Sequence, residues 1–416
     1  MSVPVVFLLV TVNLAILFLL LAAPLGARSV RRSVVVRADA ERVWAALWPL
    51  GEQAGWSGEI LSADAQADGR IATRISWSGR DGQPIERFLT PVDVRLHERF
   101  TLTISEDSSL DPSFWANYSE TVELQSAGQG TRVTVTRTDR YRGLAFLIFR
   151  WFALRRSMIK FDIWAETGTY RPGGLFEHPL TQVGLGVLSA AILWPFFGLD
   201  RQGLLLAGVL TLVVALHEMG HVAAFRIAGH ASARMVFIPL LGGIAIGGRP
   251  YDSQFEVAFS ALMGAGLSAF LVPPAILASI LAGSLGYGFA SAGFAAFAGI
   301  SALFNLGNLM PIWKFDGGQV LRQLFSEGPP LAMAAFTLLA VLGGIGLAAE
   351  MPGSVIAGCC AVIALLSFIT SGQTVKPRRD LKPIAARERG AIAAALAAAI
   401  AIHGYGVVWA AGHFLG

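Results

Sequence analysis

The residues best suited to chemistry are two histidines and a glutamate inside an apolar stretch. The segment VVALHEMGHVAAF places His217, Glu218 and His221 at the spacing H-E-x-x-H. Positions i and i+4 share one helix face, so both imidazoles can hold one Zn²⁺ while Glu218, beside the metal's open position, accepts a proton. Ionisable groups inside a bilayer cost about 2.5 to 3.5 kcal/mol each, which favours a functional site over the alternative, a polar cluster bonded among helices.

A catalytic zinc site takes three protein ligands and a water molecule. Asp316, in FNLGNLMPIWKFDGGQV, is the preferred third ligand, because Pro311 ends the helix before it and Gly317-Gly318 allows a close turn. The alternative role for Asp316 is a helix cap that faces water. The other candidate ligands are isolated histidines: His178, His230, His403 and His413.

The composition indicates a membrane protein. Of the 416 residues, 54% are hydrophobic and 14% are charged, whereas soluble domains have about 45 to 50% and about 25%. The net charge of +4 could suggest nucleic acid, but the basic residues lie beside apolar segments, so no nucleic-acid partner is expected. Cys359 and Cys360 are adjacent in an apolar run and can neither bridge a loop nor build a metal site.

Eight apolar runs predict a polytopic α-helical membrane protein with about eight transmembrane helices. The first could be a cleaved signal peptide, but residues 1–13 carry no charge, and Arg28, Arg31 and Arg32 follow it. We therefore expect residues 1–27 to be an uncleaved anchor in a bacterial inner membrane, with its C-terminal end in the cytoplasm. The runs are residues 3–24, 181–198, 203–225, 255–282, 287–309, 330–349, 353–371 and 391–411.

Residues 28–171 hold most of the charged side chains and predict a cytoplasmic α+β domain. Apolar residues alternate with polar ones around residues 71–77, 100–104 and 133–135, which is the period of half-buried strands, and Asp39 can cap a short helix. Residues 143–166 predict a long helix with an unusually apolar first half. This half could rest on the membrane, close an apolar cavity at the membrane surface, or pack on the sheet in the ordinary way.

This order of elements and the opening SVVVRADAERVWAAL resemble the START and polyketide-cyclase-like superfamily. The resemblance implies a helix-grip fold that holds a lipid or other apolar ligand between the sheet and the last helix. The alternative is a regulatory or interaction domain with an ordinary core.

Two separated motifs resemble the site-2 proteases, the intramembrane zinc metalloproteases. They are H-E-x-x-H from His217 to His221 and N-x-x-P-x-x-x-x-D-G from Asn308 to Gly317. The resemblance implies that Asp316 is the third zinc ligand and that Asn308 holds substrate backbone near the metal. A β-rich loop is also typical of the family, and residues 233–248 fit a substrate-pairing hairpin that turns at Gly242-Gly243.

The expected organisation is an anchor, the helix-grip domain, a peptidase core over residues 172–375, and a basic loop with a final helix over residues 376–416. Gly264-Ala265-Gly266 replaces the Gly-Pro pair of many site-2 proteases, and no PDZ-like insertion is evident. We expect an intramembrane zinc endopeptidase with one Zn²⁺ per chain that cuts single-span membrane proteins in regulated intramembrane proteolysis. The alternatives are a membrane-tethered sensor of lipid or another apolar ligand with a non-catalytic scaffold and, less favoured, a metal transporter.

Overall fold

The chain divides into two compact units, which we describe separately. The sheet unit contains the described residues up to 172 together with residues 378–380, and the helical unit contains those from 173 to 358 together with residues 381–415. The expected spans over residues 3–24 and 353–371 lie largely outside the described residues. The computed structural model describes residues 11, 12, 15, 18–20, 22–173, 178–238, 242–325, 327–358 and 378–415.

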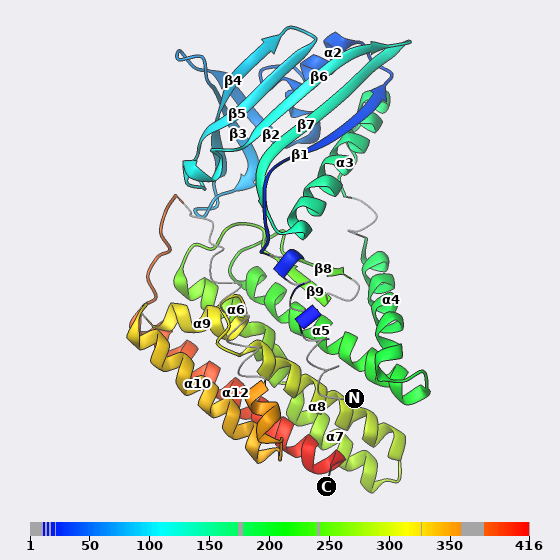
Figure 1. Cartoon of the computed structure of the whole chain (residues 1–416), viewed down its shortest axis with the longest axis vertical. Helices are drawn as coiled ribbons and strands as arrows, with labels where there is room; N and C mark the ends of the chain where they lie inside the picture. The colour runs from blue at the N-terminus through cyan, green and yellow to red at the C-terminus, as the bar shows by residue number, and fades with distance from the viewer. Residues whose placement is uncertain are drawn as a thin grey trace. The chain divides into compact units, whose positions relative to one another are not determined.

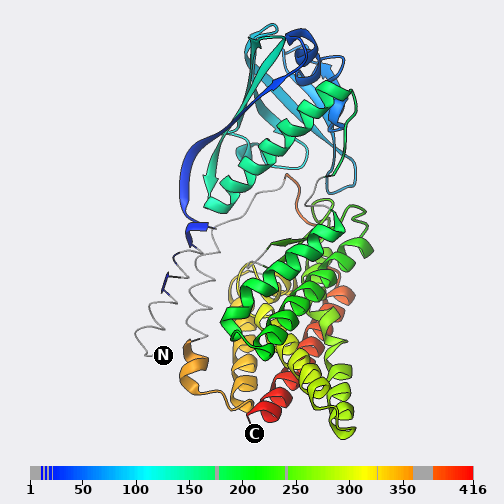
Figure 2. The same ribbon diagram turned by 90° about the vertical axis from the view of Figure 1, so that its right-hand side faces the viewer.

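The sheet unit is a seven-stranded antiparallel sheet with a long helix across one face, as Figures 1 and 2 show. The strand order is β1-β7-β6-β5-β4-β3-β2. Helix α2 (Ala40–Leu47) follows β1, and the long helix α3 (Leu144–Thr167) follows β7. The strands are β1 (Pro24–Val36), β2 (Ile60–Ala65), β3 (Ile71–Ser78), β4 (Pro84–Arg95), β5 (Arg99–Asp107), β6 (Ser119–Ala127) and β7 (Gly130–Arg142).

Local sequence signals account for these elements. Asp39 caps α2 by accepting a hydrogen bond from the Arg42 backbone N–H at 2.7 Å, as the sequence predicts. Gly82 and Gly128 adopt the positive φ angles of 76° and 63° that hairpin turns require. The core lies between the sheet and the second half of α3, where Leu154, Met158 and Phe161 are buried. The predicted α+β helix-grip architecture is therefore confirmed.

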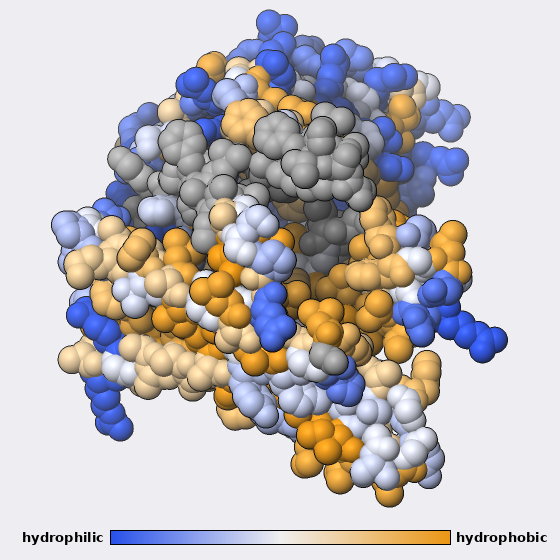
Figure 3. Space-filling view, turned by 60° about the horizontal axis from the view of Figure 1, so that its bottom comes forward, coloured by the Kyte–Doolittle hydropathy of each residue, from blue (hydrophilic) through white to orange (hydrophobic). Residues whose placement is uncertain are grey.

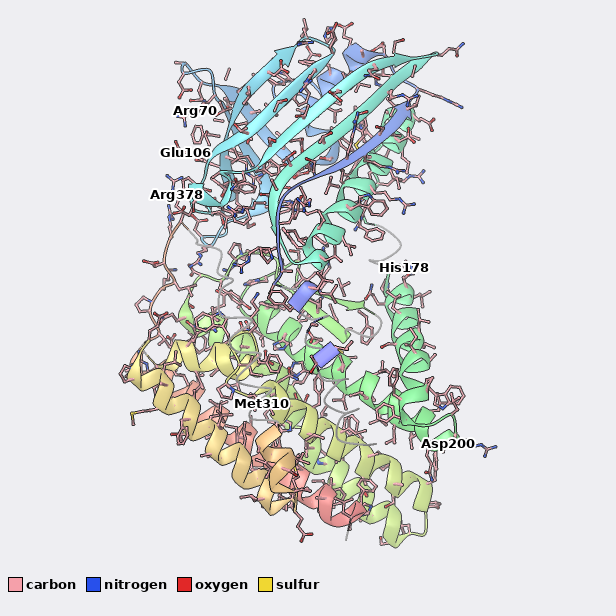
Figure 4. The ribbon with its side chains drawn as sticks, in the orientation of Figure 1. Arg70, Glu106, His178, Asp200, Met310 and Arg378 are labelled. Carbon is pink, nitrogen blue, oxygen red and sulfur yellow. The ribbon has the colours of Figure 1, made fainter. Side chains whose placement is uncertain are left out.

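A short C-terminal segment belongs to the sheet unit. The Arg378 backbone N–H donates to Ser109 O at 3.1 Å, and its guanidinium donates to Asp107 O at 3.1 Å. The same guanidinium lies 3.7 Å from Glu106, which Arg70 approaches to 2.8 Å from the other side. Figure 4 labels Arg70, Glu106 and Arg378 near one another beside the sheet.

The helical unit contains six helical segments that are long and apolar enough to cross a membrane, counted over the described residues. The chain is thus a multi-pass membrane protein by helix length and composition, and hydrophobic side chains cover much of the helical surface in Figure 3. The helices are α4 (Pro179–Phe197), α5 (Arg201–Ile227), α6 (Gln254–Ala269), α7 (Val272–Ser284), α8 (Gly288–Asn308), α9 (Asp316–Leu324), α10 (Pro329–Ala348) and α12 (Ala386–Phe414).

One predicted span is interrupted. The apolar run over residues 255–282 forms α6 and α7, which are separated at Phe270 and Leu271. Pro273 and Pro274 follow the break and have no backbone N–H to continue the hydrogen bonds of α6.

The predicted hairpin is present, but its turn is not at Gly242-Gly243 as predicted. Strands β8 (Arg234–Ile238) and β9 (Gly242–Ile246) pair antiparallel, with Gly242 opposite Ile238 and Gly243 opposite Phe237. Both glycines therefore open the second strand, and residues 239–241 lie outside the described part of the chain.

Candidate metal centre

Two helices bring two histidines and an aspartate to one point. His217 and His221 lie one turn apart on α5, and Asp316 is the first residue of α9. The two Nε2 atoms are 3.1 Å apart. Asp316 Oδ2 lies 3.2 Å from His217 Nε2 and 3.4 Å from His221 Nε2. All three ligand atoms predicted from the sequence thus lie within one small volume.

The hydrogen bonds of the other ring nitrogens fix the imidazole tautomers. His221 Nδ1 is 2.7 Å from the backbone oxygen of Ser260 on α6, which can only accept, so Nδ1 carries the hydrogen. His217 Nδ1 is 2.8 Å from Asn305 Oδ1 on α8. The Asn305 amide nitrogen donates to Ser301 O at 2.8 Å, which leaves Oδ1 as the acceptor. In both neutral rings, Nε2 therefore presents a lone pair to the cluster.

The cluster consequently gathers acceptors without a donor. Asp316 Oδ2 is buried and has no hydrogen-bond partner. Two imidazole lone pairs and a carboxylate oxygen repel one another unless a cation lies between them. For a tetrahedral Zn²⁺ with bonds of about 2.0 to 2.1 Å, two ligand atoms lie about 3.3 to 3.4 Å apart. The observed separations of 3.1, 3.2 and 3.4 Å fit such an ion.

Two glycines allow the three ligand residues to lie this close together. A Cβ added at Gly264 on α6 would lie 2.5 Å from His221 Nε2 and 2.6 Å from His217 Cε1. A Cβ at Gly317 would overlap the backbone of Leu309, so only glycine lets the chain turn closely behind Asp316.

Glu218 lies beside this cluster and is held by the hairpin. Its Oε2 accepts a hydrogen bond from the Ala245 N–H of β9 at 2.8 Å. Gly243, also on β9, leaves space for the Glu218 side chain, which an added Cβ would strike. His217, Glu218 and His221 together form a group whose ligand atoms lie within 4.8 Å of one another.

The other candidate residues have different partners. Asn308 donates to Phe304 O of its own helix at 3.0 Å, so the substrate role implied for it stays a prediction. His230 is paired with Glu256, and His403 Nε2 lies 2.9 Å from Ala265 O. His178 accepts from the Leu180 N–H at the start of α4, and His413 stacks on Trp409.

The sequence analysis missed two residues that orient the histidines. Asn305 has no exposed surface, and a polar residue inside an apolar run is itself a signal that could have identified it. Ser260 contributes a backbone oxygen, and no side-chain pattern reveals such a contact.

The sheet unit contains ion pairs in which each buried charged group meets an opposite charge. Arg87 meets the buried Asp107 at 3.0 Å, and Arg137 pairs with Glu120. This pairing raises the pKa of Arg137, and burial raises the pKa of Tyr118 beside it.

A hollow of about 760 Å³ lies at one end of the sheet unit, beside the start of α2. Its lining residues include His97, Glu98, Gln125 and Gln129.

Comparison with known proteins identifies the sheet unit. Residues 27–160 match the family model described as polyketide cyclase / dehydrase and lipid transport, so the chain carries a START-like helix-grip domain. A search of curated proteins found no match.

Solved structures cover the same third of the chain. The Aha1 dimer from Colwellia psychrerythraea is 12% identical, with a TM-score of 0.27 over 34% of this chain and 98% of that one. A START superfamily protein from Mycobacterium smegmatis is 12% identical, with a TM-score of 0.26 over 34% of this chain and 97% of that one.

Proposed function

We propose that the helical unit is a zinc-dependent endopeptidase that hydrolyses peptide bonds in or near transmembrane segments of single-span membrane proteins. The observation that carries the proposal is the meeting of three acceptor atoms, from His217, His221 and Asp316, with no donor among them. The motif resemblance to site-2 proteases supports the same activity, which would serve regulated intramembrane proteolysis.

The ligand set of two imidazoles and one carboxylate suits Zn²⁺, at one ion per chain. When bound, Zn²⁺ would lower the pKa of a water molecule to about 7 and polarise the scissile carbonyl. Asn305 and the Ser260 backbone would keep both imidazoles in the ligand tautomer, as the hydrogen-bond partners of zinc-bound histidines do in zinc enzymes.

Glu218 is the proposed general base. Its bond to the Ala245 N–H fixes one carboxylate oxygen and leaves the other to accept a proton from the attacking water. Glu218 would then return this proton to the leaving amine, so hydrolysis needs no covalent intermediate on the protein.

The substrate would bind as an extended strand. A peptide bond inside a helix is shielded by its own turn, and an unwound segment needs new hydrogen-bond partners in the membrane. The β8–β9 hairpin offers them by strand addition at Gly242 and Gly243 of β9, of which Gly243 lies next to Glu218. Asn308 would hold the substrate backbone near the metal.

The sheet unit is proposed to face the cytoplasm of a bacterial cell, because Arg28, Arg31 and Arg32 follow the first apolar run. With Cys359 and Cys360 replaced, a cysteine at the exposed Ala67 should resist an impermeant thiol reagent in intact cells. Labelling before lysis would contradict this orientation.

The direct test uses the purified full-length chain. Elemental analysis should find about one zinc per chain, and a single-span substrate should be cleaved. A chelator should abolish cleavage, and added zinc should restore it. A zinc-free protein that cleaves nothing after zinc is added would contradict the proposal.

A second candidate function is binding of a lipid or other apolar ligand by the sheet unit, with the helical unit as a scaffold. The family match over residues 27–160 supports the binding part. Lipid that copurifies with a Glu218→Gln variant would support binding independently of catalysis, whereas protein free of lipid under mild detergent would count against it.

A further inference from the structure

The first half of α3 is apolar around its whole circumference. The segment from Leu144 to Phe152 reads LAFLIFRWF, with Arg150 as the charged residue. Leu147 packs toward the core, yet large apolar side chains also point away from the sheet. A helix that is hydrophobic on all sides is normally buried in protein or in lipid. The exposed residues are Phe146 (41%), Ile148 (43%), Phe149 (63%), Trp151 (40%) and Phe152 (53%).

The second half of the same helix differs. Leu154, Met158 and Phe161 are buried on the sheet. The outer side carries charged residues such as Asp162 and Glu166 between its apolar ones. The continuous apolar surface therefore belongs to the first half, which we call the aromatic turn (residues 144–152).

The fold holds the aromatic turn at the end of the first apolar run. The Gly143 N–H donates to Ala23 O at 2.9 Å, and Arg142 pairs with Pro24 in the sheet. Residues 3–24 are the expected first span. Helix α3 begins at Leu144, directly after Gly143, whose N–H donates to Ala23 near the end of that span. If that run crosses the bilayer, the aromatic turn lies at the bilayer surface.

The charge around the aromatic turn suits anionic lipid. Aromatic residues beside arginines are typical of segments that lie in the headgroup layer. Basic residues close to an anionic membrane surface are attracted to it. No acidic side chain occurs in residues 140–161, whose basic residues are Arg140, Arg142, Arg150, Arg155, Arg156 and Lys160.

We propose that the aromatic turn is a membrane-binding element of the sheet unit. Ile148, Phe149 and Phe152 share one side of the helix and enter the boundary between headgroups and acyl chains. The neighbouring arginines meet lipid phosphates. The sheet unit is therefore attached to the bilayer by a surface of its own, in addition to its chain connections.

The test uses full-length protein in nanodiscs of phosphatidylcholine and phosphatidylglycerol, with Cys359 and Cys360 replaced by alanine. A fluorophore is attached to Phe149→Cys or, as the control, to Ile163→Cys. Ile163 is 36% exposed on the same helix, and 14 residues at 1.5 Å place it about 21 Å further along. Phospholipid with a nitroxide high on its acyl chain should quench the label at 149 several-fold more than the label at 163.

Omitting phosphatidylglycerol should weaken quenching at position 149. Equal quenching at the two positions would overturn the proposal. A label at 149 that is shielded from both the lipid nitroxide and aqueous iodide would also overturn it, because the surface would then be covered by protein, whether a partner or a second copy.

Discussion

Two buried aspartates, one in each unit, have opposite surroundings. In the sheet unit, the Asp107 carboxylate has no exposed surface, but Arg87 neutralises it and two backbone N–H groups complete its hydrogen bonds. In the helical unit, Asp316 is also buried, yet its neighbours are imidazole lone pairs. The first arrangement is complete, whereas the second gathers acceptor atoms that the proposed Zn²⁺ would join. Burial alone therefore does not identify a functional site; what identifies it is a set of ligands without a partner.

The largest expected effect follows from replacing a proposed metal ligand. His217→Ala should lose both zinc and peptidase activity, because two ligands cannot replace a set of three. His413→Ala is the control, since this exposed histidine stacks on Trp409 away from the cluster. Elemental analysis and cleavage of a single-span substrate measure the two quantities. Zinc retained in His217→Ala would show that His217 is not a required ligand.

Glu218→Gln separates the chemistry from metal binding. The amide keeps the shape of Glu218 but cannot accept a proton, so activity should fall about 10²- to 10⁴-fold while zinc stays near one per chain. Full activity in this variant would refute the proposed mechanism, and loss of zinc would mean that Glu218 is itself a ligand.

The ion pair between Arg87 and Asp107 should matter for the stability of the sheet unit and not for zinc binding or catalysis. Arg87→Met leaves Asp107 buried without its partner, which should lower the free energy of unfolding of the sheet unit by about 3 kcal/mol. Zinc content should not change. Arg95→Met is the control, since its side chain is 67% exposed and 4.0 Å from Asp93, and should cost less than about 0.5 kcal/mol. Hydrogen exchange of sheet peptides provides the measurement; equal effects would contradict the assignment.

Gly264→Ala tests how tightly the ligand set is held. The new Cβ would displace the imidazoles, so zinc affinity should fall about 10- to 100-fold, as it does when residues that orient metal ligands are changed. Gly266→Ala on the same helix is the matched control, because its Cβ would meet only Met263 Sδ, at 3.4 Å. Competition with a fluorescent chelator measures the affinity. Equal affinities in the two variants would mean that the cluster adapts freely.

The smallest expected effect is a pH dependence in the sheet unit. Burial raises the pKa of Asp139, so the folded state favours the protonated carboxyl. Its contribution to stability is thus greatest at low pH and is lost as pH rises through the folded-state pKa. Asp139→Asn should reduce the loss of stability between pH 4 and 7, whereas the exposed Asp64→Asn should not. Protease protection of the sheet unit across this range provides the measurement, and parallel curves for Asp139→Asn and wild type would contradict it.

Sequence patterns predicted the elements better than the contacts between them. The periods of strands and helices located α3 and β3 closely, because local backbone preferences and alternating burial determine them. The break between α6 and α7 was missed, since both flanks are equally apolar. The contacts from His217 to Asn305 and from His221 to Ser260 join residues 88 and 39 positions apart, and only tertiary packing decides such pairs.

The contacts of Arg378 with the sheet imply an order of events during synthesis. The last strand ends at Arg142, so the sheet can form while the chain is still being made. Arg378 follows 378 − 142 = 236 residues later, which at about 5 to 20 residues per second corresponds to roughly 12 to 47 s. During this interval, the backbone oxygens of Asp107 and Ser109 must bind water instead. The Arg378 contacts are therefore among the last to form, and a chain that stops before Arg378 would have a complete sheet without them.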